Sequence, residues 1–341
     1  MVTDSVSFTE NDIRPDELMR ENDRLHAEDL RWLLARRDRF VAVSCPACGA
    51  DVPRPLWDKD GYAYSCCDSC GTGYLNPRPE QALLEEYYRH AANYRFWQEK
   101  VFPASETVRL EQIVRPRLHR IVELCEMHGV VQGTMVEVGA GFGTFCCEAA
   151  ASGCFSRVVA VEPTPAHAEA CRQRQIEVIE LPVEKAELPE GADLVASFEV
   201  IEHLFDPGAF LRGCARILKP GGLVVITCPN LYGFDVSTLG AVSQVVDPEH
   251  LNYFHPDSLS ALFAKSGLEV LELATPGKLD AEIVRKRSLA GLFDLSTQPF
   301  LRRVLIDEWE RCGQPFQHFL ADTLLSSHMW IIGRKNIMEN V

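Results

Sequence analysis

The sequence predicts an α/β fold with a largely parallel sheet, and three observations support this prediction. The apolar run 135–138 ends in a glycine-rich turn, and a helix-compatible segment, 145–151, follows it. A second apolar strand, 157–161, ends in the acidic residue Glu162. Two more strand-like apolar segments follow before residue 230. A strand, a glycine turn, a helix and an acid-tipped strand are the layout of a nucleoside site at the carboxyl edge of a parallel sheet.

The glycine turn and the acid carry the first candidate site. Gly139, Gly141 and Gly143 let the backbone pass close to a ligand, and the Glu162 carboxylate can accept hydrogen bonds from vicinal ribose hydroxyls. Their spacing is G-x-G-x-G, whereas dinucleotide-binding turns have G-x-G-x-x-G with a pyrophosphate at the helix N-terminus. A tight turn is the alternative for the glycines alone. The strand before them and the acid after them favour a cofactor site.

With an acid, Glu137, inside the first strand, this pattern resembles motif I of class I S-adenosylmethionine (SAM) methyltransferases. The SAM ligand carries a sulfonium cation and no phosphate. The loop 181–189 resembles the segment after the family's third strand, where an acid at the position of Glu184 meets the adenine amine. Residues 192–204 resemble the fourth strand with its E-V-I-E-H-L continuation, and 218–226 the P-G-G turn and fifth strand.

The resemblance implies a Rossmann-like, seven-stranded class I methyltransferase domain with SAM as cofactor, and it covers roughly residues 131–230. The cofactor-binding residues that it implies are Glu137, Gly139, Gly141, Gly143, Glu162, Glu184, Phe198 and Glu199.

Four cysteines form a second candidate site. Two C-x-x-C-G knuckles each turn tightly enough for two thiolates to grip one metal, and together they complete a tetrahedral site. A closed four-sulfur shell predicts a structural Zn²⁺ that supplies folding energy to a short segment. A redox dithiol is the alternative use, and Cys66 offers an alternative register. The predicted ligands are Cys45, Cys48, Cys67 and Cys70.

Charge and composition limit the classes of partner and the cellular compartment that we expect. The chain has 341 residues, a formal charge of −15 and 13 cysteines, which favours a cytoplasmic protein with thiols rather than disulfides. Neither a membrane span nor a signal-like start is predicted. Nucleic acid is disfavoured because phosphate contacts need clustered Lys and Arg. Arg31, Arg36, Arg37 and Arg39 precede the cysteines, but acids are interleaved, and a solvated helix is the simpler interpretation.

The order of the segments predicts additions around the catalytic domain. The segment before motif I is expected to lie over the cofactor, and the long stretch before the last strand is too long for a plain loop. A homodimer is a further hypothesis. The predicted parts are a helical segment (1–40), a zinc ribbon (41–78), a helical connector (79–130), the SAM-binding domain (131–274), an inserted helical cap (275–326) and the last strand with a tail (327–341).

Methyl transfer from a sulfonium is an in-line displacement, so positioning does most of the work. A hydroxyl or activated carbon acceptor also loses a proton, and an imidazole suits that role. His203 follows the fourth strand, and His250 and His255 come from the loop after the fifth. Glu202 could orient an imidazole or act itself. The candidate catalytic residues are therefore His203, His250 and Glu202, each with a structural role as the alternative. In the cap, Lys278 or Arg285 could hold a phosphate, but a solvated helix face is the simpler interpretation of the basic run 285–287.

The ribbon and the segments Y-L-N-P-R-P and P-E-H-L-N-Y-F resemble bacterial sugar and secondary-metabolite methyltransferases, especially deoxysugar C-methyltransferases. The resemblance implies a small polar acceptor, a sugar or nucleotide-sugar, methylated on oxygen or carbon. The C-terminal cap departs from those enzymes, so O-methylation stays equally open. One alternative is an RNA methyltransferase whose zinc ribbon binds substrate. Another is a non-catalytic SAM-binding scaffold.

Overall fold

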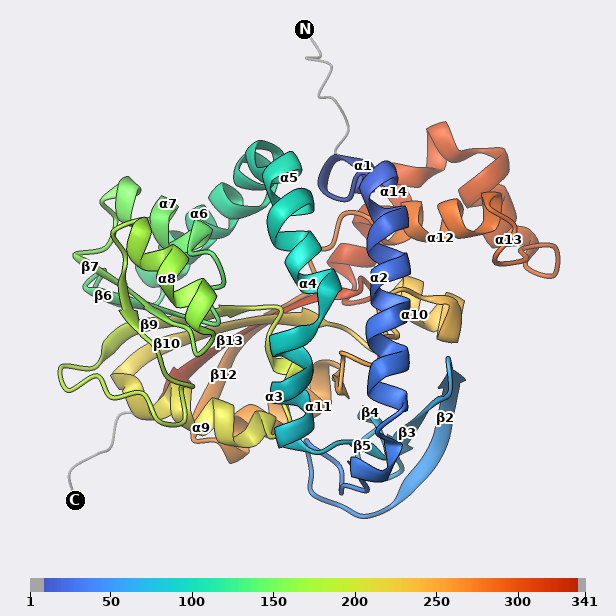
Figure 1. Cartoon of the computed structure of the whole chain (residues 1–341). Helices are drawn as coiled ribbons and strands as arrows, with labels where there is room; N and C mark the ends of the chain where they lie inside the picture. Colours follow the sequence, from blue (N-terminus) through green and yellow to red (C-terminus); the bar gives the residue numbers. More distant parts are fainter. Residues whose placement is uncertain (1–8, 337–341) are drawn as a thin grey trace, which may run out of the picture.

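The computed structural model describes residues 9–336, so the expectations for 1–8 and 337–341 lie outside it. A central twisted sheet carries helices on both faces, with a smaller sheet beside it (Figure 1). The strands of the central sheet are β6 (Thr134–Val138), β7 (Arg157–Val161), β8 (Glu177–Ile179), β9 (Ala192–Phe198), β10 (Leu218–Pro229), β12 (Leu268–Ala274) and β13 (His328–Lys335).

These seven strands lie in the order β12-β13-β10-β9-β6-β7-β8. The five strands from β10 to β8 run parallel, and β13 pairs antiparallel with both β10 and β12. The predicted Rossmann-like sheet of seven strands is confirmed. Because crossover helices cover both faces, strands such as β6 are buried along their whole length and need continuous apolar sequence.

Alternate residues of the strands enter two different cores. Met135, Leu194 and Val225 pack with α6 (Arg115–Met127) and α7 (Thr144–Ser152) on one face. On the other face, Val136, Val195 and Val224 pack with α9 (Pro207–Ile217) and α11 (Pro256–Lys265). This is the period-two alternation that a strand imposes. Because both faces of each strand are buried in this way, only residues at the strand ends can project side chains into open space at the carboxyl edge.

The cysteine segment folds as a second sheet, which includes a strand from the catalytic half of the chain. Its strands are β2 (Pro53–Lys59), β3 (Tyr62–Cys67), β4 (Gly73–Leu75) and β11 (Asn252–Tyr253), in the order β11-β4-β3-β2. Asn252 pairs with Tyr74, and Tyr253 with Gly73. A separate short pair joins β1 (Phe40–Val41) to β5 (Arg78–Pro79). Strand pairing between β4 and β11 thus joins the cysteine segment to the loop that follows β10.

Helices from the N-terminal third cover the carboxyl edge of the central sheet. After α1 (Glu10–Ile13), the long helix α2 (Asp16–Leu34) runs beside the connector helices (Figure 1). Leu30 and Leu33 are buried in one apolar cluster with Tyr62 of the small sheet, so this face of α2 packs on that sheet. The connector consists of α3 (Gln81–His90), α4 (Ala92–Phe96), α5 (Phe102–Arg109) and two π-helical turns, 97–101 and 110–114.

The stretch between β12 and β13 is largely helical. It contains α12 (Asp280–Leu289), α13 (Pro299–Arg302) and α14 (Trp309–Asp322), and it packs against α10 (Phe234–Leu239). Its apolar cluster is distinct from those of the central sheet. The N-terminal helices, the connector and this stretch therefore all lie around one edge of the sheet.

Candidate cofactor and acceptor site

A cavity of about 1390 Å³ lies at the carboxyl ends of β6 and β9. Its walls come from the glycine turn, from α2 and the connector, from the loop 242–250 and from Arg287 of α12. Ligand pockets typically span roughly 300–1,000 Å³. This cavity therefore has room for a cofactor and a second small molecule side by side.

The glycine turn needs its glycines for steric reasons. Gly139 has φ 76°, and a Cβ there would lie 2.6 Å from Cγ2 of Val200. Gly143 has φ 70°, and a Cβ would lie 2.9 Å from Sγ of Cys171. Both positions favour glycine because L side chains rarely adopt this conformation. The backbone of Gly139 and Gly141 lines the cavity, whereas buried Gly143 serves the packing of α7 against α8 (Pro165–Gln173).

The two acids near the turn differ in their roles. The carboxylate of Glu162, at the tip of β7, accepts hydrogen bonds from the backbone N–H groups of Gly141 and Thr164, both at 2.9 Å. Burial opposes its ionisation, but His167 and these N–H groups outweigh burial and lower the pKa of Glu162. Glu137 lines the cavity and accepts from the Cys146 thiol at 3.0 Å; burial raises its pKa to about 7.

The end of β9 carries an aromatic and an acid that face the cavity. Phe198 packs on Phe145, with ring centroids 4.8 Å apart. Glu199 accepts a hydrogen bond from Thr227 at 2.6 Å and has φ 55°, an uncommon conformation for a residue with a side chain. Arg117 of α6 lies 4.6 Å from the centroid of Phe198 and 3.9 Å from Glu199. It adds a cation to the cavity wall that sequence reasoning missed, because nothing in a helical sequence marks this position.

Only part of the predicted set is brought together in the cavity wall. Glu137, Gly139, Gly141, Phe198, Glu199, His203 and His250 line it, and Gly143, Glu162, Glu184 and Glu202 are not among the described lining residues. Glu184 lies in the loop after β8, half-buried beside Gly213 of α9. A contact of Glu184 with an adenine amine therefore stays a prediction.

At the candidate acceptor end, where the loop 242–250 lines the cavity, two imidazoles and a carboxylate lie close together. The rings of His203 and His250 lie 4.7 Å apart, centroid to centroid, at 76°. Glu202 precedes His203 in the short helical turn Ile201–His203 and is 1% exposed. Burial and the nearby Glu199 raise the pKa of Glu202, whereas burial and His250 lower the pKa of His203 to about 4. One ligand atom from each of the three residues lies within 4.8 Å of the others.

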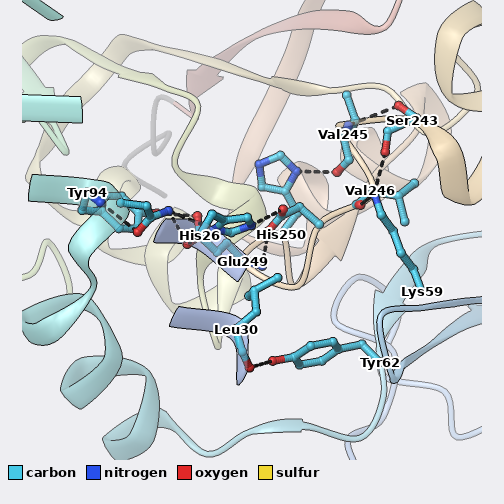
Figure 2. Close-up of polar contacts among 12 residues, drawn as sticks. His26, Leu30, Lys59, Tyr62, Tyr94, Ser243, Val245, Val246, Glu249 and His250 are labelled. Carbon is cyan, nitrogen blue, oxygen red and sulfur yellow. Dashed lines mark hydrogen bonds and ion pairs between the residues drawn. The ribbon is translucent and has the colours of Figure 1, made fainter. Parts of the chain in front are cut away.

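A charged network ties α2 to this end of the cavity (Figure 2). His26 Nε2 lies 2.7 Å from Asp247 Oδ2, and His26 Nδ1 lies 3.5 Å from Glu249 Oε1. Tyr94 Oη donates to Glu249 at 3.1 Å, and Tyr87 Oη also donates to it. Asp247 and Glu249 lie in the loop 242–250, just before His250. Their contacts with His26 of α2 and with Tyr94 of the connector therefore hold this loop, which is the candidate acceptor loop, in place. In the sequence, the only signal that pointed to Asp247 and Glu249 was that they lie next to the candidate residue His250.

His26 should make stability fall in alkaline solution. Burial alone would lower the pKa of His26, but its contacts with Asp247 and Glu249 outweigh burial and raise that pKa to about 10. Its stabilising charge is therefore complete below the unfolded value of about 6.5 and is lost as the pH rises towards 10. We expect His26→Gln to remove that part of the alkaline loss and to destabilise the chain at pH 7 by about 1–3 kcal/mol. Urea unfolding at pH 6, 8 and 10 measures both effects; identical pH profiles would contradict the ion pairs.

Two residues that the sequence offered as possible contacts have other neighbours in the structure. His255 does not face the acceptor end: it is 4% exposed, its Nε2 lies 2.7 Å from the carbonyl oxygen of Cys70, and its ring stacks on Tyr232. Arg285 lies 5.0 Å from the ring centroid of Trp309 within the cap, and the cavity is lined from α12 by Arg287 instead. In both cases the open question was the direction of the side chain. The sequence of a loop or of a weakly amphipathic helix does not encode that direction.

The four predicted cysteines of the knuckles do come together. Sγ of Cys45 lies 3.5 Å from Sγ of Cys70, and Sγ of Cys48 lies 3.5 Å from Sγ of Cys67. All four sulfur atoms lie within 4.8 Å of one another. Tetrahedral Zn–S bonds of about 2.3 Å would put sulfurs roughly 3.8 Å apart, so the thiols fit such an ion. Cys66 lies outside the cluster, and its sulfur accepts from Arg54.

The sheet order, the glycine turn and the acid-tipped strand resemble the arrangement of class I SAM-dependent methyltransferase domains. Residues 109–273, just under half of the chain, match the family model described as a methyltransferase domain.

Two curated relatives overlap the same region. A probable S-adenosylmethionine-dependent methyltransferase of Mycobacterium tuberculosis is 32% identical over 152 residues, which cover 43% of this chain and 51% of that protein. A ubiquinone biosynthesis O-methyltransferase of Bradyrhizobium is 28% identical over 170 residues, covering 44% and 66%. The chain thus spans about half to two thirds of the length of these relatives.

Solved structures also resemble the chain. An S-adenosylmethionine-dependent methyltransferase from Clostridium acetobutylicum aligns over 70% of this chain and 99% of its own, with 10% identity and a TM-score of 0.46. Within residues 9–336, no helix has the length and apolarity needed to cross a membrane.

Proposed function

We propose that this chain transfers the methyl group of SAM to a small polar acceptor. The observation that carries the proposal is the single cavity wall formed by the glycine turn, the end of β9 and the imidazoles of His203 and His250. The glycine turn and Glu137 would hold the cofactor, and the imidazole end would contact the acceptor. SAM supplies an electrophilic methyl group, and the chain supplies alignment and exclusion of water.

The chemistry at the acceptor end favours an oxygen or an activated carbon as nucleophile. His203 and His250 point their rings at one another in the wall, and Glu202 lies behind them. We propose that this cluster contacts the acceptor atom that gains the methyl group and loses a proton. The nucleophile's electron pair forms the new bond to carbon, its proton passes to a neutral imidazole of this pair, and the C–S pair returns to sulfur as S-adenosylhomocysteine leaves.

The acceptor that we propose is sugar-derived, with a nucleotide-linked sugar first. The cavity exceeds the needs of the cofactor alone, and its lining includes cations from three separate elements: Arg31 of α2, Lys59 of β2 and Arg287 of α12. Such cations suit a phosphate-bearing acceptor. The overall charge of −15 argues against the alternative of an RNA acceptor.

We also propose that the four clustered thiols hold a structural Zn²⁺, because their sulfurs already surround one point and leave no open position for substrate. The ion would stabilise the small sheet and, through β11, the loop that carries His250.

A screen of nucleotide-sugars against the protein loaded with S-adenosylhomocysteine tests the acceptor class. We expect a subset to raise the unfolding temperature and to accept a labelled methyl group from SAM. Methylation of RNA fragments with no response to any nucleotide-sugar would contradict the proposed acceptor.

A further inference from the structure

Glu202 poses an electrostatic problem within the protein. It is 1% exposed, and its Oε2 has no hydrogen-bond partner among the described residues. A buried carboxylate without a partner costs several kcal/mol unless a proton or a cation neutralises it. The nearest groups that could share a cation with it are the two imidazoles at the cavity wall.

Both imidazoles are oriented in the way that metal-bound histidines usually are. His203 Nδ1 lies 3.0 Å from the carbonyl oxygen of Glu249, and His250 Nδ1 lies 2.7 Å from that of Val245 (Figure 2 shows the latter). A carbonyl oxygen only accepts, so each Nδ1 carries the hydrogen and each neutral ring keeps its lone pair on Nε2. Backbone carbonyls that fix the tautomer in this manner are typical outer-shell partners of metal ligands.

The three residues also have the right separation. One oxygen of Glu202 and one nitrogen from each ring lie within 4.8 Å of one another. Metal bonds of about 2.1 Å to nitrogen and oxygen place neighbouring ligand atoms roughly 3–4 Å apart, so small side-chain rotations would complete the set. The rings line the cavity and the carboxylate lies behind them, which leaves the remaining coordination positions on the cavity side.

We propose that Glu202, His203 and His250 bind one divalent first-row transition metal ion, whose open positions take an oxygen of the acceptor. Two imidazoles and one carboxylate are a donor set for ions such as Zn²⁺ and Mn²⁺. The ion would neutralise Glu202 and would replace a free imidazole as the group that contacts the acceptor. The acceptor's place beside the ion rests on the proposed methyltransferase function; the binding of the ion does not.

Metal stoichiometry tests this directly. The full chain is stripped with a chelator, its cysteine cluster is refilled with one equivalent of Zn²⁺, and it is then dialysed against Zn²⁺ or Mn²⁺. We expect the wild type to retain one further equivalent of at least one of these ions. Glu202→Gln, which keeps the side-chain volume, and His250→Ala should each bind that equivalent at least tenfold more weakly.

His119→Ala is the matched control, because this histidine lies on α6 with a side chain 77% exposed. It should bind metal like the wild type. If neither ion adds a second equivalent to the wild type, or if both variants bind it at wild-type affinity, the proposal is wrong. S-adenosylhomocysteine titration of samples whose cysteine cluster is refilled with Zn²⁺, but which carry no second ion, separates the two ideas. Cofactor binding without a second ion overturns only the metal site, and absence of cofactor binding overturns the methyltransferase function.

Discussion

Glu162→Ala should weaken the binding of S-adenosylhomocysteine at least tenfold. A pair of hydrogen bonds from ribose hydroxyls to a buried carboxylate contributes about 1.5–3 kcal/mol, and each carboxylate oxygen has a further lone pair beyond the one used by the protein. In addition, this carboxylate holds the N–H group of Gly141, whose backbone lines the cavity. Its loss would therefore loosen the turn that faces the cofactor.

The control for this experiment is Glu169→Ala, which removes an exposed acid from the following helix, α8. It should leave the affinity unchanged. Glu162→Gln should give an intermediate loss, because the amide keeps one accepting oxygen. Calorimetric titration gives the dissociation constants, and thermal unfolding shows whether the variants stay folded. An affinity of Glu162→Ala within twofold of the wild type would contradict the placement of the cofactor.

Cys67→Ser should lower zinc content and stability together, with a loss on the order of 4 kcal/mol or more, because loss of a metal site belongs to the few single changes that reach this size. The loss of stability should extend to the candidate acceptor loop, 242–250. β11 pairs with β4, and Lys59 Nζ donates to the carbonyl oxygens of Ser243 and Val246 at 3.0 and 2.6 Å. We therefore expect methyl transfer to fall although the cluster does not line the cavity.

Cys66→Ser provides a matched control one residue away. Cys66 lies outside the four-thiol cluster, so this variant should keep its zinc and most of its stability. Metal analysis and urea unfolding of the two variants decide the register. Full zinc occupancy in Cys67→Ser, with loss of zinc in Cys66→Ser, would move the ligand to Cys66.

Local sequence features predicted the regular elements well. The strand-like part of 192–204 is β9, and the helix-compatible segment 145–151 lies within α7, because continuous apolar strands and glycine turns act over short distances. The register of the cysteines was predictable for the same reason, since the C-x-x-C-G spacing is itself a local geometric requirement.

Contacts between distant segments were not predictable in this way. The pairing of β11 with β4, the approach of His26 to Asp247 and the inward position of Arg117 each join segments far apart in the sequence. No local periodicity encodes such pairings. His255 shows the same limit: the sequence left open whether this loop histidine contacts the acceptor or has a structural role, and in the structure its ring contacts the backbone of a cysteine knuckle.

The most direct test of the central proposal is calorimetric titration of the full chain with S-adenosylhomocysteine. We expect one site per chain with a dissociation constant in the micromolar range, and competition by SAM. Absence of binding by the folded, zinc-loaded protein would contradict the proposal that this cavity is a methyltransferase cofactor site.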